Sequence, residues 1–286
     1  MAIRPNCNFC GHGLPRGPSS CPHCGQPGRY QNVDDAGAGE EQVALDLRYR
    51  SAVADSAARG AEDRLKDFEM AVGKSKAVIS RPLDFLQPLA QSDNVLYATY
   101  YKLMQAEVRL PEGGKWDILR AVTDEALFTG FKEEIRFAAL SLDGVGIFNY
   151  GPCSITLREE MISHRASAFE ENSVLFMDHR QVLMKDAHDL PKGYRSLWAE
   201  RAKLCISKLA KSIDRSTQPD EYSGLLIRQG ATTDDDHFVE VHIWGGLTRR
   251  TMERVIVPRP KNAVERTITE AIKVGLQAVG ATLEIR

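Results

Sequence analysis

Residues 234–248 read Asp-Asp-Asp-His-Phe-Val-Glu-Val-His-Ile-Trp-Gly-Gly-Leu-Thr, and this stretch predicts a β-strand in the larger part of the chain. Within it, Glu240 and His242 alternate with aliphatic residues at 239, 241 and 243. Because successive side chains of a β-strand point to opposite faces, the alternation predicts a strand with the carboxylate and the imidazole on one face. A second apolar stretch follows at residues 252–257 and indicates another strand.

The pair formed by Glu240 and His242 has two interpretations. A carboxylate beside an imidazole on a sheet face suits acid–base catalysis or the recognition of a sugar. The alternative is the solvent-exposed face of an edge strand, where charged side chains guard against aggregation. The three aspartates at 234–236 favour a turn over a metal site, because consecutive residues do not converge on one ion.

A second polar segment lies upstream, at residues 150–173. A predicted half-buried strand at 154–157 is followed there by a dense run of His, Arg, Ser, Glu and Asn. Such side chains can converge on a polar pocket at the end of a strand. The alternative is a charged helix whose first turn is capped by Ser163 or Ser167 and whose Arg and Glu residues decorate one face.

Further predicted strands and helices alternate around these two segments. Hydrophobic periodicity predicts strands at 135–140, 225–227 and 282–285, and helices at 43–75, 116–127, 193–213 and 263–279. Many connections are as short as hairpins, which favours an α+β domain over a doubly wound parallel sheet. Neither of the glycine-rich phosphate-binding patterns occurs in the sequence.

The N-terminal region contains two Cys-x-x-Cys pairs, each followed by a glycine: Cys7, Cys10, Cys21 and Cys24. Two residues between thiolates let one tight turn present both sulfurs to a single ion, and the glycine permits the positive φ that aims backbone N–H groups at them. The segment resembles a short zinc ribbon. Four thiolates imply a structural Zn2+ site with no open position for catalysis, and a reducing compartment disfavours the alternative of disulfides.

The sequence therefore predicts an α+β protein in four parts. They are a four-cysteine zinc ribbon at residues 1–28, a linker at 29–42, a helical connector at 43–92 and a mixed α+β domain with the predicted catalytic residues at 93–286. The linker is inferred from its small, polar and acidic residues. The connector is inferred from a long amphipathic pattern with few glycines.

The overall composition indicates which partners and which compartment to expect for the protein. A net charge of −2 and an isoelectric point near 6.4 predict no global attraction to nucleic acid or to an anionic membrane. The sequence has no apolar run of the roughly 18 residues that a membrane span needs, and no export signal precedes Cys7. With Cys153 and Cys205 isolated, these features predict a cytoplasmic protein whose paired thiols bind metal.

The aromatic-Val-Glu-Val-His-Ile-x-Gly-Gly-Leu-Thr strand, followed by the apolar strand at 252–257, resembles the late strand pair of bacterial and phage ADP-ribosyltransferase-like toxin domains. The resemblance implies a main domain of that fold that uses NAD as cosubstrate. It implies that Glu240 is the catalytic glutamate, which stabilises the oxocarbenium-like ribose as nicotinamide leaves. The further residues that it implies are His242 and Arg165 for catalysis, and Tyr150, Arg165, Ser167 and Asn172 for NAD contacts.

The chain departs from the family at Phe238. Members that modify arginine often have an acidic residue or Gln two positions before the catalytic glutamate, so a protein-arginine acceptor is less expected here. The expected acceptor is a nucleic acid or a protein, selected partly through the zinc ribbon.

Two other functions compete with this one. A metal-independent toxin-type ribonuclease would use four residues as general acid, general base and phosphate clamp: His164, Arg165, Glu240 and His242. A non-catalytic adaptor would bind a partner through the ribbon and the polar sheet face. NAD-independent RNA cleavage would distinguish the first, and a Glu240→Gln variant with unchanged activity in cells would distinguish the second.

Overall fold

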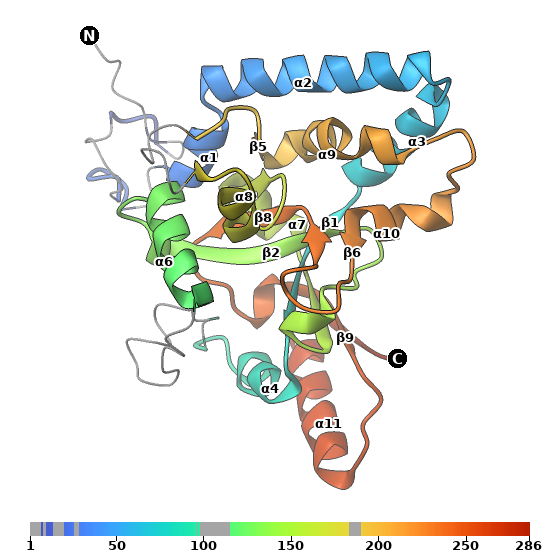
Figure 1. Cartoon of the computed structure of the whole chain (residues 1–286). Coiled ribbons are helices and arrows are strands. Elements are labelled where there is room, and N and C mark those ends of the chain that lie inside the picture. Colours follow the sequence, from blue (N-terminus) through green and yellow to red (C-terminus); the bar gives the residue numbers. More distant parts are fainter. Residues whose placement is uncertain are drawn as a thin grey trace.

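The computed structural model describes residues 7, 10–13, 20–25, 29–95, 97, 115–182 and 190–286. It is a mixed α+β structure, as the sequence predicts, and its centre is an eight-stranded sheet with the order β10-β9-β3-β1-β2-β8-β4-β5 (Figure 1). The strands of this sheet are β1 (Lys76–Arg81), β2 (Ile135–Ser141), β3 (Cys153–Leu157), β4 (Ala166–Phe169), β5 (Arg195–Leu197), β8 (Glu240–Trp244), β9 (Met252–Val257) and β10 (Thr282–Ile285). A separate two-stranded sheet pairs β6 (Ile227–Arg228) with β7 (His237–Phe238).

The neighbours in the large sheet are antiparallel, except for the parallel pair of β9 and β10. The antiparallel pairing of this sheet does not come from hairpins, because even the antiparallel neighbours that lie nearest in sequence, β4 and β5, are separated by residues 170–194. β8 lies inside the sheet, between β2 and β4, so the interpretation of Glu240 and His242 as residues of an exposed edge strand is wrong. On the opposite face of β8, Val241 and Ile243 are completely buried in the main hydrophobic core, as their alternation predicts.

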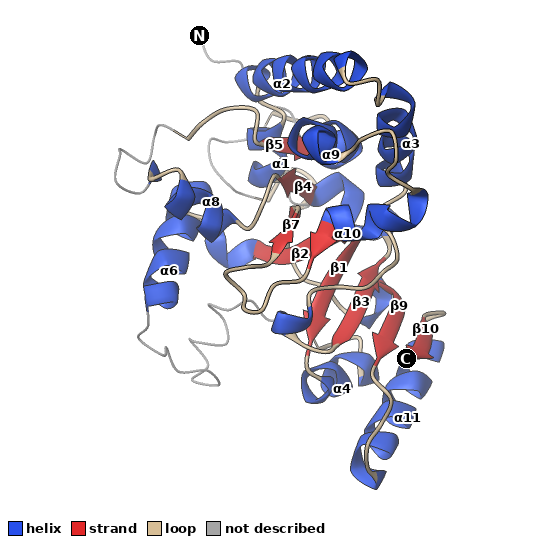
Figure 2. Cartoon of the chain, turned by 45° about the vertical axis from the view of Figure 1, so that its right-hand side comes forward, coloured by secondary structure: helices blue, strands red, loops and turns tan. Residues whose placement is uncertain are grey.

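The longer helices form three groups around the sheet, which Figures 1 and 2 show from two sides. The first group is α2 (Gly39–Ala58), α3 (Glu62–Gly73) and α9 (Arg201–Leu209); the second is α4 (Leu83–Gln91) with α11 (Ala263–Gln277); the third is α6 (Lys115–Leu127) with α8 (Ser173–His179). Short helices complete the fold: α1 (Gln31–Ala36), α7 (Glu159–Ile162) and α10 (Tyr222–Leu226). Within the described residues, none of the helices has both the length and the apolar character needed to cross a membrane.

The structure divides the first hundred residues differently from the sequence-based prediction. α1 lies within the predicted linker, and its Asn32 and Ala36 are buried. β1 lies within the predicted helical connector and pairs with β2 and β3 in the middle of the sheet. The boundary at residue 92 therefore does not separate two packing units, because β1 completes the sheet and the core of the rest of the chain.

Two predicted helices are shorter in the structure than their periodicity indicates. The helix predicted at 43–75 is interrupted between α2 and α3, where Gly60 has a φ of +67° that other residues rarely adopt. The helix predicted at 193–213 has its α-helical part at α9, and residues 195–197 form β5 instead. Pairing with β4 decides the conformation there over local propensity.

Candidate functional site

The four cysteines of the N-terminal region converge as their spacing predicts. Their sulfur atoms all lie within 4.8 Å of one another, with Cys7 Sγ 3.8 Å from Cys24 Sγ and Cys10 Sγ 3.5 Å from Cys21 Sγ. In a tetrahedral site with metal–sulfur bonds of about 2.3 Å, neighbouring sulfurs lie about 3.8 Å apart. The cluster therefore fits one metal ion. Residues 14–19, between the two cysteine pairs, lie outside the described residues.

The backbone of both cysteine pairs adopts the predicted turn. Gly11 and Gly25 have φ values of +74° and +71°, and their N–H groups donate to the carbonyls of Cys7 and Cys21. The N–H groups of Cys24 and His23, with the side chains of Cys10 and Cys24, lower the pKa of the Cys21 thiol to about 6. At Cys10 the backbone of His12 lowers the pKa, but burial and the other three thiols outweigh it and raise the pKa to about 12. The contacts within the cluster therefore favour the metal-binding thiolate at Cys21 and the thiol at Cys10.

Glu240 and His242 form a second, buried site on β8. His242 Nε2 lies 2.7 Å from Glu240 Oε1, and the two residues are only 3% and 2% exposed. Three phenylalanine rings surround the imidazole, with centroids at 4.8 to 5.6 Å: Phe128, Phe137 and Phe169. The register of the sheet explains this arrangement, because Phe137 of β2 lies directly opposite His242 and Phe169 of β4 lies opposite Glu240.

Arg120 and Asp124 of α6 join this pair, and the sequence alone did not identify them. Arg120 Nη1 lies 3.3 Å from Asp124 Oδ1 and donates to Ser173 Oγ at 3.1 Å. The backbone N–H of Ser173 in turn approaches Glu240 Oε2 at 3.5 Å. In sequence, Arg120 and Asp124 look like an ordinary helix-surface pair four residues apart. Only tertiary packing, which sets α6 against α8, buries Asp124 to 1% exposure.

Opposing effects set the ionisation of Glu240. Burial alone would raise the pKa of its carboxyl group. The hydrogen bond and charge of His242, the charge of Arg120 and a side-chain hydrogen bond with Ser173 outweigh burial and hold the pKa of Glu240 below its usual value. The site therefore contains a desolvated carboxylate that stays ionised at neutral pH.

Tyr150 and Asn172, two of the predicted NAD contacts, lie beside this carboxylate. Asn172 Nδ2 donates to the Tyr150 hydroxyl at 3.1 Å, and Asn172 Oδ1 caps α8 through the N–H of Val174 at 2.9 Å. Burial raises the pKa of Tyr150 to about 12, and the negative charge of Glu240 contributes to the rise. The phenol therefore stays protonated at neutral pH. The structure brings together four of the six predicted residues: Glu240, His242, Tyr150 and Asn172.

Arg165 and Ser167 make other contacts, and their predicted roles stay predictions. Arg165 donates to the carbonyls of Met161 at 3.0 Å and Gly246 at 3.2 Å. The Ser167 hydroxyl accepts from Asn32 of α1 at 3.3 Å. Ser167 lies directly opposite His242 in the register of β4 and β8, so its side chain shares the face of the site.

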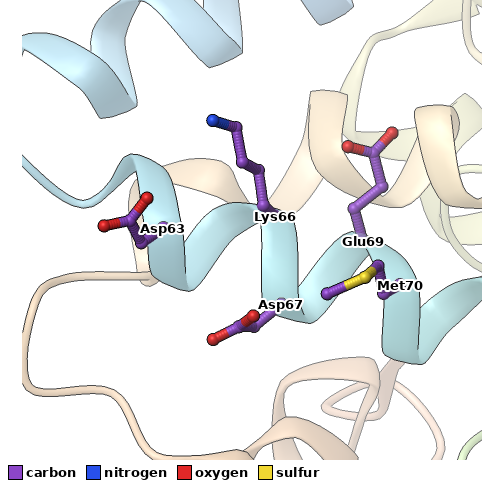
Figure 3. Close-up of a pocket in the computed structure, with 5 residues that line it drawn as sticks. All are labelled: Asp63, Lys66, Asp67, Glu69 and Met70. Carbon is purple, nitrogen blue, oxygen red and sulfur yellow. The ribbon is translucent and has the colours of Figure 1, made fainter.

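A hollow of about 570 Å³ on the surface of α3 is a separate feature. Its lining comes from one helix: Asp63, Lys66, Asp67, Glu69 and Met70 (Figure 3). Glu69 accepts a hydrogen bond from Tyr49 at 2.9 Å, and Lys66 pairs with Glu62 at 2.8 Å. Among the described residues this lining comes from α3 alone, so the β8 site is the stronger candidate for a functional site.

Comparison with known proteins gives no family for this chain, because neither a family model nor a curated protein matches it.

Proposed function

We propose that this protein is an ADP-ribosyltransferase-like enzyme that uses NAD to modify a macromolecular acceptor. The observation that carries the proposal is the buried Glu240 carboxylate, held by His242 at 2.7 Å and kept ionised by His242 and Arg120. Cleavage of the nicotinamide–ribose bond develops positive charge on the ribose. A fixed carboxylate in a desolvated site lowers the barrier to such a step by several kcal/mol.

In the proposed reaction, the C1′–N bond breaks and its electron pair leaves with neutral nicotinamide. A nucleophilic oxygen or nitrogen of the acceptor forms the new bond to C1′ and gives up its proton to water. Glu240 balances the charge at C1′, and His242 fixes the orientation of the carboxylate. Tyr150, held by Asn172, contributes a protonated phenol at the same place.

The same geometry favours glycosyl transfer over the ribonuclease. A general acid and a general base that act on one phosphate face it from two sides. Glu240 and His242 instead bond to each other. Of the other two residues that the ribonuclease requires, His164 packs edge-on against Tyr30 at 5.6 Å and Arg165 binds backbone carbonyls.

The proposal includes Zn2+ in the four-cysteine site, as a structural ion that Cys7, Cys10, Cys21 and Cys24 hold as thiolates. The ion would fold the ribbon, and the ribbon would dock the nucleic acid or protein acceptor. A reducing compartment such as the cytoplasm suits these thiolates.

The test is transfer of label from NAD labelled in its ADP-ribose part. Purified protein is incubated separately with RNA, DNA and cell lysate, and nicotinamide release is measured in parallel. We expect label on one acceptor class, and a loss of roughly 10²- to 10³-fold in rate for Glu240→Gln.

Glu41→Gln is the matched control. Glu41 is also buried, at 1% exposure, and is paired with Arg195 at 2.7 Å, but it belongs to α2. The Glu41→Gln variant should be less stable than the wild-type protein but should still transfer label from NAD. If the wild-type protein transfers no label and releases no nicotinamide in any mixture, the proposed activity is refuted, and RNA cleavage without NAD would establish the ribonuclease instead.

A further inference from the structure

The segment that follows the ribbon is built into the site. α1 contacts β4, β5 and β8 of the large sheet. Tyr30, directly before α1, is only 7% exposed, and its ring meets those of His164 and Trp244 edge-on at 5.6 and 6.3 Å. Residues 29–36 thus belong to the packed body of the protein.

Asn32 makes the polar connection between α1 and the two strands. Its Nδ2 atom lies 3.0 Å from the carbonyl oxygen of His242, 3.2 Å from that of Arg165 and 3.3 Å from Ser167 Oγ. The residue is only 3% exposed. One amide group therefore spans β4 and β8 at the position where Ser167 and His242 are register partners.

The three partners of Asn32 fix the orientation of its amide. Two of them are carbonyl oxygens, which only accept hydrogen bonds, so the NH2 end has to face them. The other end, Oδ1, is buried and has no hydrogen-bond partner among the described residues. An unsatisfied buried oxygen is destabilising. The stabilising contacts of this amide therefore come from its N–H donors, which join α1 to β4 and β8.

We infer that Asn32 is a positioning residue for the Glu240–His242 pair: its amide locks the backbone of His242 to β4 and so sets the direction of the imidazole. This inference rests on the proposed function for its catalytic consequence, but the geometry it describes does not depend on NAD. A shift of about 1 Å at a catalytic group can change a rate by roughly 100-fold, so a backbone lock of this kind affects turnover.

The test uses Asn32→Asp in the full-length, metal-loaded protein. The substitution keeps the shape of the side chain but removes both N–H donors and places a carboxylate against two carbonyl oxygens. We expect the 15N resonances of the His242 ring to move. We also expect kcat for nicotinamide release to fall roughly 10- to 100-fold, with less than about a twofold change in KM for NAD. Asn32→Ala, which removes both donors without adding a charge, should move the same resonances and lower kcat in the same direction, and it carries the test if Asn32→Asp does not fold.

Asn262→Ala is the control for general destabilisation. Asn262 caps α11 by accepting from the N–H of Glu265 at 2.9 Å, and α11 packs on α4 and β10 rather than on β8. Its loss should lower stability and leave the His242 resonances and kcat unchanged.

The outcomes separate this inference from the proposed function. If the folded Asn32 variants leave the His242 resonances in place, the positioning role is refuted even in an active enzyme. Moved resonances in a protein whose wild type releases no nicotinamide would support the positioning role and refute the proposed function. If kcat falls in Asn262→Ala as much as in Asn32→Asp, the effect is one of stability and the inference fails.

Discussion

The four-cysteine ribbon and the Glu240 site each consist of a few polar side chains. Those of the ribbon lie close together in the sequence, whereas those of the Glu240 site lie far apart. The ribbon draws its sulfurs from residues 7–24. The second site draws on Arg120, Tyr150, Ser173 and Glu240, and the sheet brings them together. Local spacing alone specifies the first site. The second exists only when β2, β8 and β4 pair in one register, so its stability is that of the whole domain.

The largest expected effect is the loss of the ribbon on metal removal. A segment this short has no apolar core, so metal binding supplies its folding free energy. We expect a chelator, or Cys10→Ser, to abolish the dispersed NMR signals of residues 7–25 while those of the eight-stranded sheet stay in place. The comparison breaks down if the sheet signals are lost together with the ribbon, because the two regions would then fold as one unit.

The second-largest effect is expected when the buried pair of Glu240 and His242 is broken. His242→Ala leaves the Glu240 carboxylate desolvated without its main partner, and removing one member of a buried pair costs roughly 3–5 kcal/mol. Urea unfolding measures the loss. The double variant His242→Ala with Glu240→Gln should regain part of the stability, since no charge is left unpaired. If the losses in the free energy of unfolding of the two single variants simply add in the double variant, the two side chains are not directly coupled.

Acid should affect the domain through Glu240. Its folded-state pKa lies below the ordinary value of 4.5, so ionisation contributes stability that is fully present above about pH 4.5 and is lost as the pH falls toward the lower folded pKa. We expect the free energy of unfolding to decline below pH 4.5, and to decline less steeply in Glu240→Gln. Equal slopes in the two proteins would mean that other carboxylates dominate the acid response.

The smallest effect tests the local geometry of the ribbon. Gly25 has a φ of +71°, and a methyl group added there would meet no atom of the other described residues within 4 Å, its chain neighbours aside. Gly25→Ala therefore adds only backbone strain, about 1–2 kcal/mol, which should weaken metal affinity by roughly tenfold. Competition with a colorimetric chelator measures this change. Unaltered affinity would show that the turn does not need the left-handed conformation.

The sequence predicted the parts of the fold whose signals are local. The alternation around Glu240 gave the correct strand and the correct faces, and the predicted α+β class is also correct. Local signals failed where tertiary pairing decided the outcome. Residues 195–197 form a strand because they pair with β4. Residues 31–36 form a helix that packs against β4 and β8 and buries Asn32 and Ala36.

The candidate site was predictable only in part, for the same reason. Glu240 and His242 are two residues apart on one strand, so their contact follows from strand geometry. Arg120, Asp124 and Asn32 approach them from helices far away in sequence, and nothing in their local patterns separates them from surface residues.

Spacings of a few residues were enough to specify the four-cysteine cluster and the shared face of Glu240 and His242, and the order of the predicted strands and helices indicated the mixed α+β class. Only the tertiary structure decided that β8 lies inside the sheet, that the carboxylate is buried beside Arg120, and that α1 is fastened to the site by Asn32. The physical reason is that burial and charge are properties of neighbours in space, and sheet register chooses those neighbours.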